Sequence, residues 1–211
     1  MPKPRPEEIK ITGPAGGLEA IHELPAGTAP RGAAVVLHPH PQYGGTMNNK
    51  VVHTLARSFI ASDFAALRFN FRGTEGSAGT YDEGIGEVDD ALAAIGWLRA
   101  QYPNLPLWVA GFSFGAAMAI RAAVQAEPDG LIAVAPAVSR FAAGLDRQPR
   151  CPWLVIQGDQ DELVDIDDTI AWFDTLDPGP ELLVLPGVSH FFHGRLIELR
   201  EAALEFVTAN S

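Results

Sequence analysis

Short apolar runs alternate along this chain with longer stretches in which apolar residues recur every three or four positions. Compact apolar runs suit buried β-strands, whereas the longer spacing is that of helices with one apolar face. Buried strands are expected over residues 33–37, 65–71, 107–110, 131–134, 153–157 and 182–185. Before them, residues 7–12 and 18–24 alternate between apolar and polar types and predict two short strands joined by a glycine-rich turn.

The helical stretches lie between these strands. Thr46 is expected to cap a helix whose apolar face starts at Val51 and includes Phe59. A longer amphipathic helix is expected over residues 83–101, with Ile85 on its apolar face. Further helices are expected over residues 116–125, 166–175 and 195–207. Strands that alternate with helices predict an α/β fold, with a mostly parallel central sheet of about eight strands and helices on both faces.

Length and composition fit one domain over residues 1–211. The chain is 47% hydrophobic and 19% charged, which is ordinary for a soluble globular protein. Its formal net charge is −11 at pH 7, and its acidic residues are spread along the chain. Such a surface offers no basic footprint for nucleic acid and is repelled by anionic membranes, so neither partner is expected.

Cysteine content and the N-terminal residues indicate a cellular location. The only cysteine, Cys151, excludes an internal disulfide and fits a reducing compartment. Residues 1–6 are followed by no apolar stretch of the kind found in signal peptides, and no apolar run approaches the length of a membrane span. The chain is therefore expected to be cytoplasmic.

The most distinctive chemistry lies in Gly111-Phe112-Ser113-Phe114-Gly115, between an expected strand and an expected helix. In that context Gly-x-Ser-x-Gly predicts a nucleophile elbow, a tight turn that projects the serine hydroxyl from the end of the sheet. Gly111 and Gly115 allow the strand and the helix to approach each other closely. The first helical turn would then place backbone N–H groups near the serine oxygen, where an oxyanion develops.

A serine hydroxyl is a weak nucleophile, so Ser113 needs a histidine to take its proton and a carboxylate to orient that histidine. Elbow-type hydrolases carry these residues in the order serine, acid, histidine. His190 lies in the loop directly after the last expected strand and is the expected base, with His193, expected in the closing helix, as the alternative. The acid should follow the strand at 153–157, where spacing alone does not distinguish Asp159 from Asp161.

With these motifs, the chain resembles a small, lidless member of the α/β-hydrolase superfamily, near the dienelactone-hydrolase-like and carboxylesterase-like proteins. The resemblance extends over residues 9–207. Such proteins show Gly-x-x-Asp-x-x-Val after the second strand beyond the elbow. Gly158, Asp161 and Val164 match that pattern, so the resemblance assigns the acid to Asp161. The family's final histidine is commonly followed by phenylalanine, as His190 is here.

Residues 37–41, Leu-His-Pro-His-Pro, resemble the family's His-Gly-x oxyanion loop with proline in place of glycine. Because proline has no N–H to donate, the resemblance implies that the oxyanion donors are the backbone N–H groups of Phe114 and His40. Gln42 and Tyr43 are alternatives to His40. A second segment, Phe69-Asn70-Phe71-Arg72-Gly73, resembles the family's Asp-x-Arg-Gly, with asparagine where aspartate is usual. It is expected to brace the neighbouring loops and has no expected catalytic role.

Many members of the superfamily carry a cap between the strand after the elbow and the strand before the acid. Here the corresponding interval, residues 139–151, is too short for a cap domain, so a shallow, open site is expected. The candidate walls of its pocket are all apolar or aromatic: Tyr43, Met47, Phe114, Phe191 and Phe192.

Together, these features predict a serine hydrolase that cleaves a carboxylic ester or thioester of a small molecule through an acyl-enzyme on Ser113. Neither a metal nor a cofactor is expected, since a His190/His193 pair has no third ligand nearby. Dienelactone hydrolases proper use a cysteine nucleophile, so their substrate does not transfer to this chain. The alternatives are a peptidase or amidase of the same fold, or a non-catalytic binding protein that retains the fold.

Overall fold

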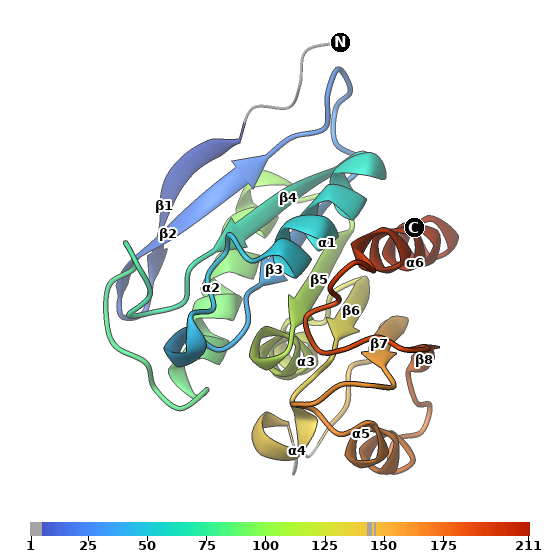
Figure 1. Cartoon of the computed structure of the whole chain (residues 1–211). Helices are drawn as coiled ribbons and strands as arrows, with labels where there is room; N and C mark the ends of the chain where they lie inside the picture. Colours follow the sequence, from blue (N-terminus) through green and yellow to red (C-terminus); the bar gives the residue numbers. More distant parts are fainter. Residues whose placement is uncertain (1–5, 143–144, 146) are drawn as a thin grey trace.

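The computed structural model describes residues 6–142, 145 and 147–211 (Figure 1). One eight-stranded sheet runs through it in the order β1-β2-β4-β3-β5-β6-β7-β8. The first two pairings, β1 with β2 and β2 with β4, are antiparallel, and the remaining neighbours are parallel. The strands are β1 (Glu7–Gly13), β2 (Gly16–Glu23), β3 (Gly32–Leu37), β4 (Phe64–Phe69), β5 (Leu107–Phe112), β6 (Gly130–Val134), β7 (Trp153–Gly158) and β8 (Glu181–Leu185).

Helices cover both faces of this sheet. α1 and α6 pack side by side on one face, and α2 and α3 on the other (Figure 1). The helices are α1 (Lys50–Ala61), α2 (Gly86–Gln101), α3 (Phe114–Ala126), α4 (Val138–Phe141), α5 (Ile166–Phe173) and α6 (Leu196–Ala209), with a 3-10 turn η1 (Pro41–Tyr43). The mostly parallel sheet between two helical layers confirms the predicted fold class.

Strand β3 shows why the central strands are continuously apolar in the sequence. Val35 and Leu37 pack into the core beneath α2 and α3, whereas Ala34 and Val36 pack into the core beneath α1 and α6. With a helical layer on each face, neither set of side chains reaches water, and all six residues of β3 are buried. The polar loops that leave the carboxyl ends of β3, β4, β5 and β7 then meet at one edge of the sheet.

Two local expectations were wrong. Helix α1 is capped by Asn49, whose side-chain oxygen accepts the Val51 N–H at 2.9 Å, whereas Thr46 lies in the preceding turn. Helix α2 begins at Gly86, and Ile85 is 65% exposed instead of facing the core. The cause lies in Glu87, a buried carboxylate that accepts backbone N–H groups from the loop before the helix and fixes where the helix starts.

The interval expected to be too short for a cap holds the short helix α4, which the sequence pattern did not reveal. Three residues of this interval, 143, 144 and 146, lie outside the described part of the chain.

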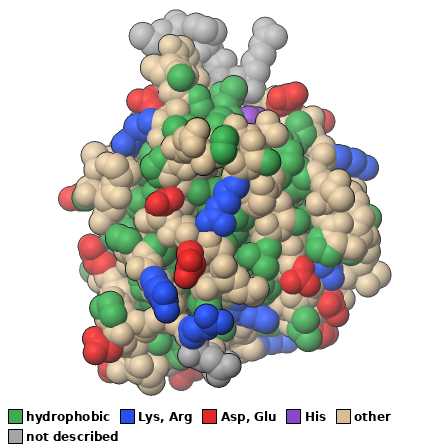
Figure 2. Space-filling view, turned by 180° about the vertical axis from the view of Figure 1, so that it is seen from behind, with side chains coloured by type: hydrophobic (Ala, Val, Ile, Leu, Met, Phe, Trp, Pro, Cys, Tyr) green, Lys and Arg blue, Asp and Glu red, His purple; other side chains and the backbone are tan. Residues whose placement is uncertain are grey.

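Within the described ranges, no helix is both long and apolar enough to cross a membrane. Figure 2 shows the face opposite to that of Figure 1, which carries both acidic and basic side chains, with several basic ones close together in the lower middle of the view.

Asn70, directly after β4, connects three segments of the chain and is fully buried. Its carboxamide oxygen accepts the N–H of Met47 at 2.8 Å. Its amide nitrogen donates to the carboxylates of Glu19, at 2.7 Å, and Glu75, at 3.2 Å. An aspartate at this position could not donate to either carboxylate and would add a third negative charge to the group. The departure from the family's aspartate therefore follows from the neighbours that this chain has.

We expect Asn70→Asp to lower the free energy of unfolding by about 2 to 4 kcal/mol near neutral pH, since it removes two hydrogen bonds to carboxylates and adds like charge. Glu19 and Glu75 would raise the pKa of the new carboxyl, so the loss should be full above that pKa and should shrink as the pH falls through it. Chemical denaturation at about pH 7 and about pH 5 measures both effects. The exposed change Asn48→Asp is the matched control, and an Asn70→Asp variant as stable as wild type at neutral pH would contradict the explanation.

Candidate active site

Ser113 occupies the sharp turn between β5 and α3 with a positive φ, at φ 56° and ψ −117°. Such a conformation is strained for a residue with a side chain and persists only where the surroundings hold it. Its N–H donates to the carbonyl of Val134 on the adjacent strand at 2.8 Å. Its carbonyl accepts N–H groups from Ala116 and Ala117 in the first turn of α3, at 3.0 and 3.1 Å. The serine is therefore fixed to the sheet on one side and to the helix on the other.

Two glycines make this turn sterically possible. A β-carbon on Gly111 would lie 2.3 Å from the carbonyl oxygen of Gly115, across the turn. One on Gly115 would lie 2.4 Å from the carbonyl oxygen of His38 and 2.5 Å from that of Leu37. These contacts are with backbone atoms, which cannot move aside as a flexible side chain can. The close approach expected from Gly-x-Ser-x-Gly is thus present, and it extends to the loop after β3.

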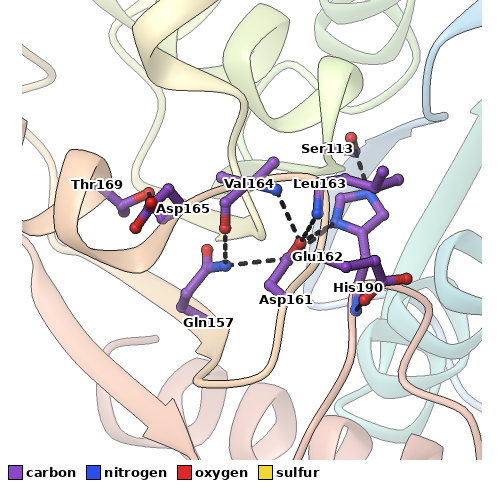
Figure 3. Close-up of polar contacts among 9 residues, drawn as sticks. All are labelled: Ser113, Gln157, Asp161, Glu162, Leu163, Val164, Asp165, Thr169 and His190. Atoms are coloured by element: carbon purple, nitrogen blue, oxygen red, sulfur yellow. Dashed lines mark hydrogen bonds and ion pairs between the residues drawn. The ribbon is translucent and has the colours of Figure 1, made fainter.

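The structure brings Ser113, His190 and Asp161 together from three separate loops (Figure 3). His190 Nε2 lies 3.1 Å from Ser113 Oγ. On the other side of the ring, His190 Nδ1 lies 2.8 Å from Asp161 Oδ2 and 3.0 Å from Asp161 Oδ1. The side chains of His190 and Asp161 are only 3% and 1% exposed, so the ion pair between them is buried. This is the arrangement in which an imidazole can remove the serine proton while a carboxylate orients the ring.

Asp161 is held by several donors besides His190 (Figure 3). Its Oδ1 accepts the backbone N–H groups of Leu163, at 2.9 Å, and Val164, at 2.8 Å. Its Oδ2 accepts the side-chain amide of Gln157 at 3.0 Å. Burial acts to raise the pKa of Asp161, but the hydrogen bonds from His190, Val164 and Leu163 outweigh it, so the pKa lies below its ordinary value. The carboxylate is therefore ionised where it faces the imidazole.

Asp159 and His193, the alternative candidates for the acid and the base, lie outside this network. Asp159 is exposed and accepts the N–H of Gly187 at 2.6 Å, which holds the loop after β8 in place. His193 is exposed in the turn before α6, not in that helix as expected, because the helix begins only at Leu196. Within the described part of the chain, no three His, Cys, Asp or Glu side chains come together in a metal-binding arrangement. The geometry thus selects Asp161 over Asp159 and His190 over His193 as neighbours of Ser113.

Gln157 is a residue of this network that the sequence reading missed. It lies in β7 and is fully buried, and its amide also donates to the Val164 carbonyl at 3.3 Å. One side chain thus holds the carboxylate of Asp161 and the backbone of the loop that carries it. The available signal was a glutamine within an otherwise apolar strand, four positions before the acid. An uncharged donor there stabilises the ionised carboxylate without adding charge.

The loop after β3 provides a backbone N–H at His40 that has no acceptor among the described residues. Pro39 and Pro41 have none, and among the described residues the N–H of His40 donates to no acceptor. The same holds for the N–H of Phe114 at the start of α3. The N–H groups of residues 42–45 all have acceptors: Gln42 (the His40 ring, 3.2 Å), Tyr43 (the His40 carbonyl, 3.1 Å), Gly44 (the Pro41 carbonyl, 3.3 Å) and Gly45 (the His40 carbonyl, 3.0 Å). The N–H groups of His40 and Phe114 are therefore free to donate, whereas those of Gln42 and Tyr43 are not.

A cavity of about 650 Å³ lies over these groups and is lined by Ser113, His190, His40 and Phe114. Its walls include Tyr43 and Phe191, as predicted, together with three residues that the sequence did not single out: Arg140, Phe141 and Leu163. The rim is open, since Tyr43 is 78% exposed, Leu163 64% and Phe191 42%.

Two predicted wall residues do not line the cavity. Met47 is 4% exposed, and its backbone is held by the side chains of Asn70 and Arg68. Phe192 is completely buried and packs in the core against Phe112, at 6.4 Å between ring centroids. Both predictions were wrong for the same reason: an apolar side chain beside an active-site loop is as readily used to anchor that loop as to form its surface.

The sheet order and the strand–serine–helix turn define the α/β-hydrolase fold. A family model described as serine aminopeptidase, S33, matches residues 28–149, more than half of the chain. A crystal structure of an α/β serine hydrolase without a lid from Xanthomonas campestris is 42% identical, with a TM-score of 0.92, and the match covers 99% of this chain and 96% of that one.

Two further proteins are similar to this chain over most of its length. An α-β serine hydrolase homologue from Coxiella burnetii is 43% identical with a TM-score of 0.89, over 94% of this chain and 96% of that one. An uncharacterized protein of Rickettsia prowazekii (strain Madrid E) is 33% identical, and the match covers 95% of this chain and 88% of that protein. The chain therefore belongs to the α/β serine hydrolase family, and it is a hydrolase of that class.

Gly115→Ala should lower the free energy of unfolding by about 2 to 4 kcal/mol, because the new methyl group has to displace the backbone at Leu37 and His38. Gly96→Ala, in an exposed and open position of α2, is the control. It should stabilise the protein by about 0.5 to 1 kcal/mol, as expected for glycine to alanine within a helix. Thermal and chemical denaturation of both variants measure the difference, and a Gly115→Ala variant of unchanged stability would contradict the close approach.

Gln157→Leu should lower kcat/KM by about 10- to 100-fold, the equivalent of one hydrogen bond to a charged group. Gln157→Glu should cost more, since it sets a second carboxylate against Asp161. Hydrolysis of a 4-nitrophenyl ester measures both. Gln160→Leu, an exposed change in the same loop, is the control and should leave the rate unchanged. Equal rates for Gln157→Leu and wild type would show that the contact with Asp161 has no effect on the chemistry.

Proposed function

We propose that this protein hydrolyses carboxylic esters or thioesters of small molecules through an acyl-enzyme on Ser113. The observation that supports this most strongly is the 3.1 Å contact between Ser113 Oγ and His190 Nε2, with the ionised Asp161 on the far side of the ring. Ser113, Asp161 and His190 follow one another along the chain in the order serine, acid, histidine. This is the order of the elbow-type serine hydrolases, to whose family the protein belongs.

In the proposed reaction, Ser113 Oγ attacks the acyl carbon while His190 Nε2 takes the hydroxyl proton. The negative charge that develops on the acyl oxygen is stabilised by the N–H groups of His40 and Phe114. His190 then gives its proton to the leaving alcohol or thiol, and the acyl group stays on Ser113. Water, deprotonated by the same imidazole, releases the acid and regenerates the serine. None of these steps requires a metal or an organic cofactor.

The cavity walls suit an apolar acyl group, and the open rim sets few limits on the size of the substrate. Aromatic and aliphatic walls come from Phe114, Phe141, Leu163 and Phe191, and the exposed rim allows part of a larger substrate to remain in solvent. Short acyl chains, or acyl groups attached to larger carriers, fit such a site best. The chemistry proposed for Ser113 is the same for an ester and for a thioester.

A peptidase or amidase is the second candidate, favoured by the description of the matching family model as a serine aminopeptidase. Asp165 and Asp168 line the cavity and carry charge of the sign that would attract a free amino group. The Asp165 carboxylate, however, already accepts the Asp167 N–H at 2.8 Å and caps α5. Amino-acid 4-nitroanilides offered beside 4-nitrophenyl esters distinguish the two activities, and faster cleavage of the anilides would favour the peptidase.

Labelling by a fluorophosphonate probe and turnover of 4-nitrophenyl acetate test the proposal directly. Wild type should label stoichiometrically, and Ser113→Ala should not label at all. Ser113→Ala and His190→Ala should each lose about 10⁴-fold or more in kcat, and Asp161→Asn somewhat less, because the members of such a triad act as a unit. His193→Ala and Asp159→Asn are the matched controls and should keep the activity. Wild type that neither labels nor turns over would favour a binding protein that has lost its chemistry.

A further inference from the structure

The imidazole of His38 lies directly beneath the loop that carries the His40 N–H. It follows the last residue of β3 and is completely buried. Its Nε2 lies 3.0 Å from the backbone nitrogen of Phe71, and its Nδ1 lies 2.6 Å from the carbonyl oxygen of Pro39. Since the Phe71 N–H can only donate, Nε2 accepts, and the ring proton is on Nδ1. Nδ1–H therefore donates to the Pro39 carbonyl.

That carbonyl belongs to the same peptide unit as the His40 N–H. In a planar trans peptide, the C=O and the N–H point in opposite directions, so a donor that fixes one fixes the other. Gly45 adds a second constraint, because a β-carbon there would lie 2.0 Å from the Pro39 oxygen. The Pro39–His40 peptide is thus held by the hydrogen bond from the His38 ring and packs closely against Gly45, and it cannot rotate without breaking that hydrogen bond.

The surroundings of His38 keep its ring neutral. Burial lowers the pKa of His38 to about 4, against a smaller opposing effect of its hydrogen bond to Pro39. Phe71 also packs edge-on against the ring, with 4.7 Å between the centroids. A neutral imidazole has one donor and one acceptor, and both are used here, one toward Pro39 and one toward Phe71. His38 therefore ties the loop after β3 to the segment after β4.

We propose that His38 is a positioning residue for the oxyanion: it orients the Pro39–His40 peptide so that the His40 N–H faces the acyl oxygen in the transition state. His38 itself touches no reacting atom. The hydrogen bond on the carbonyl also polarises the peptide and strengthens the N–H as a donor. This role rests on the proposed function, since it concerns the stabilisation of charge on an acyl oxygen.

Two substitutions separate this role from simple bracing of the loop. His38→Asn places an amide near the position of Nδ1, so it retains a donor for the Pro39 carbonyl and leaves the Phe71 N–H without an acceptor. His38→Gln extends an amide toward the position of Nε2, so it retains the acceptor and loses the donor. If His38 only braces the loop, the two variants should differ in stability but not in catalysis.

We expect His38→Gln to lower kcat by about 10- to 100-fold while KM changes by less than about twofold, because the loss falls on the transition state. His38→Asn should stay within about threefold of wild-type kcat even if its Tm falls. A boronic acid that forms a tetrahedral adduct on a serine provides the second readout. Its affinity should fall in His38→Gln in parallel with kcat, whereas binding of the carboxylate product should not.

Equal kcat and equal boronate affinity in the two variants would overturn the proposal, whatever their melting temperatures. If His38→Asn does not fold, His38→Gln alone decides, since wild-type kcat and boronate affinity in that variant contradict the role. Turnover by wild type is measured first. Its absence would overturn the proposed function and this role with it, whereas active wild type with indifferent variants would overturn the role of His38 alone.

Discussion

The strained turn at Ser113 is the constraint on which the rest of the site depends. It exists because strand β5 and helix α3 meet without side chains at Gly111 and Gly115, and because the serine backbone is bonded to both elements. The same closeness brings the carbonyls of Leu37 and His38 against the start of α3. The elbow and the loop after β3 therefore pack directly against each other.

Side-chain amides hold carboxylates at two places in the molecule. Asp161 is ionised in the interior because backbone N–H groups, Gln157 and His190 bond it, and Asn70 bonds two carboxylates in the place of a third. At Asp161 these donors replace the water around the carboxylate, and because they are fixed they need no reorganisation during a reaction.

Periodicity and motif context together were sufficient for the fold, for Ser113 and for His190, whereas the choice of Asp161 needed the family resemblance and Gln157 was missed. Continuous apolar runs mark strands that are covered on both faces, so β3 and β5 were found almost to their ends. What failed were features decided by tertiary contacts. Met47 and Phe192 were expected at the cavity and lie in the interior, and neither the cap of α1 nor the exposure of Ile85 follows from spacing.

The central claim, that the acyl group is transferred to Ser113, can be tested most directly by trapping that intermediate. Wild-type protein is mixed with 4-nitrophenyl acetate, quenched with acid during the first turnover, and analysed by intact-protein and peptide mass spectrometry. The account predicts one acetyl group per chain, on the peptide that contains Ser113, formed together with a burst of 4-nitrophenolate. Turnover without an acylated protein, or with the acetyl group on another residue, would contradict it.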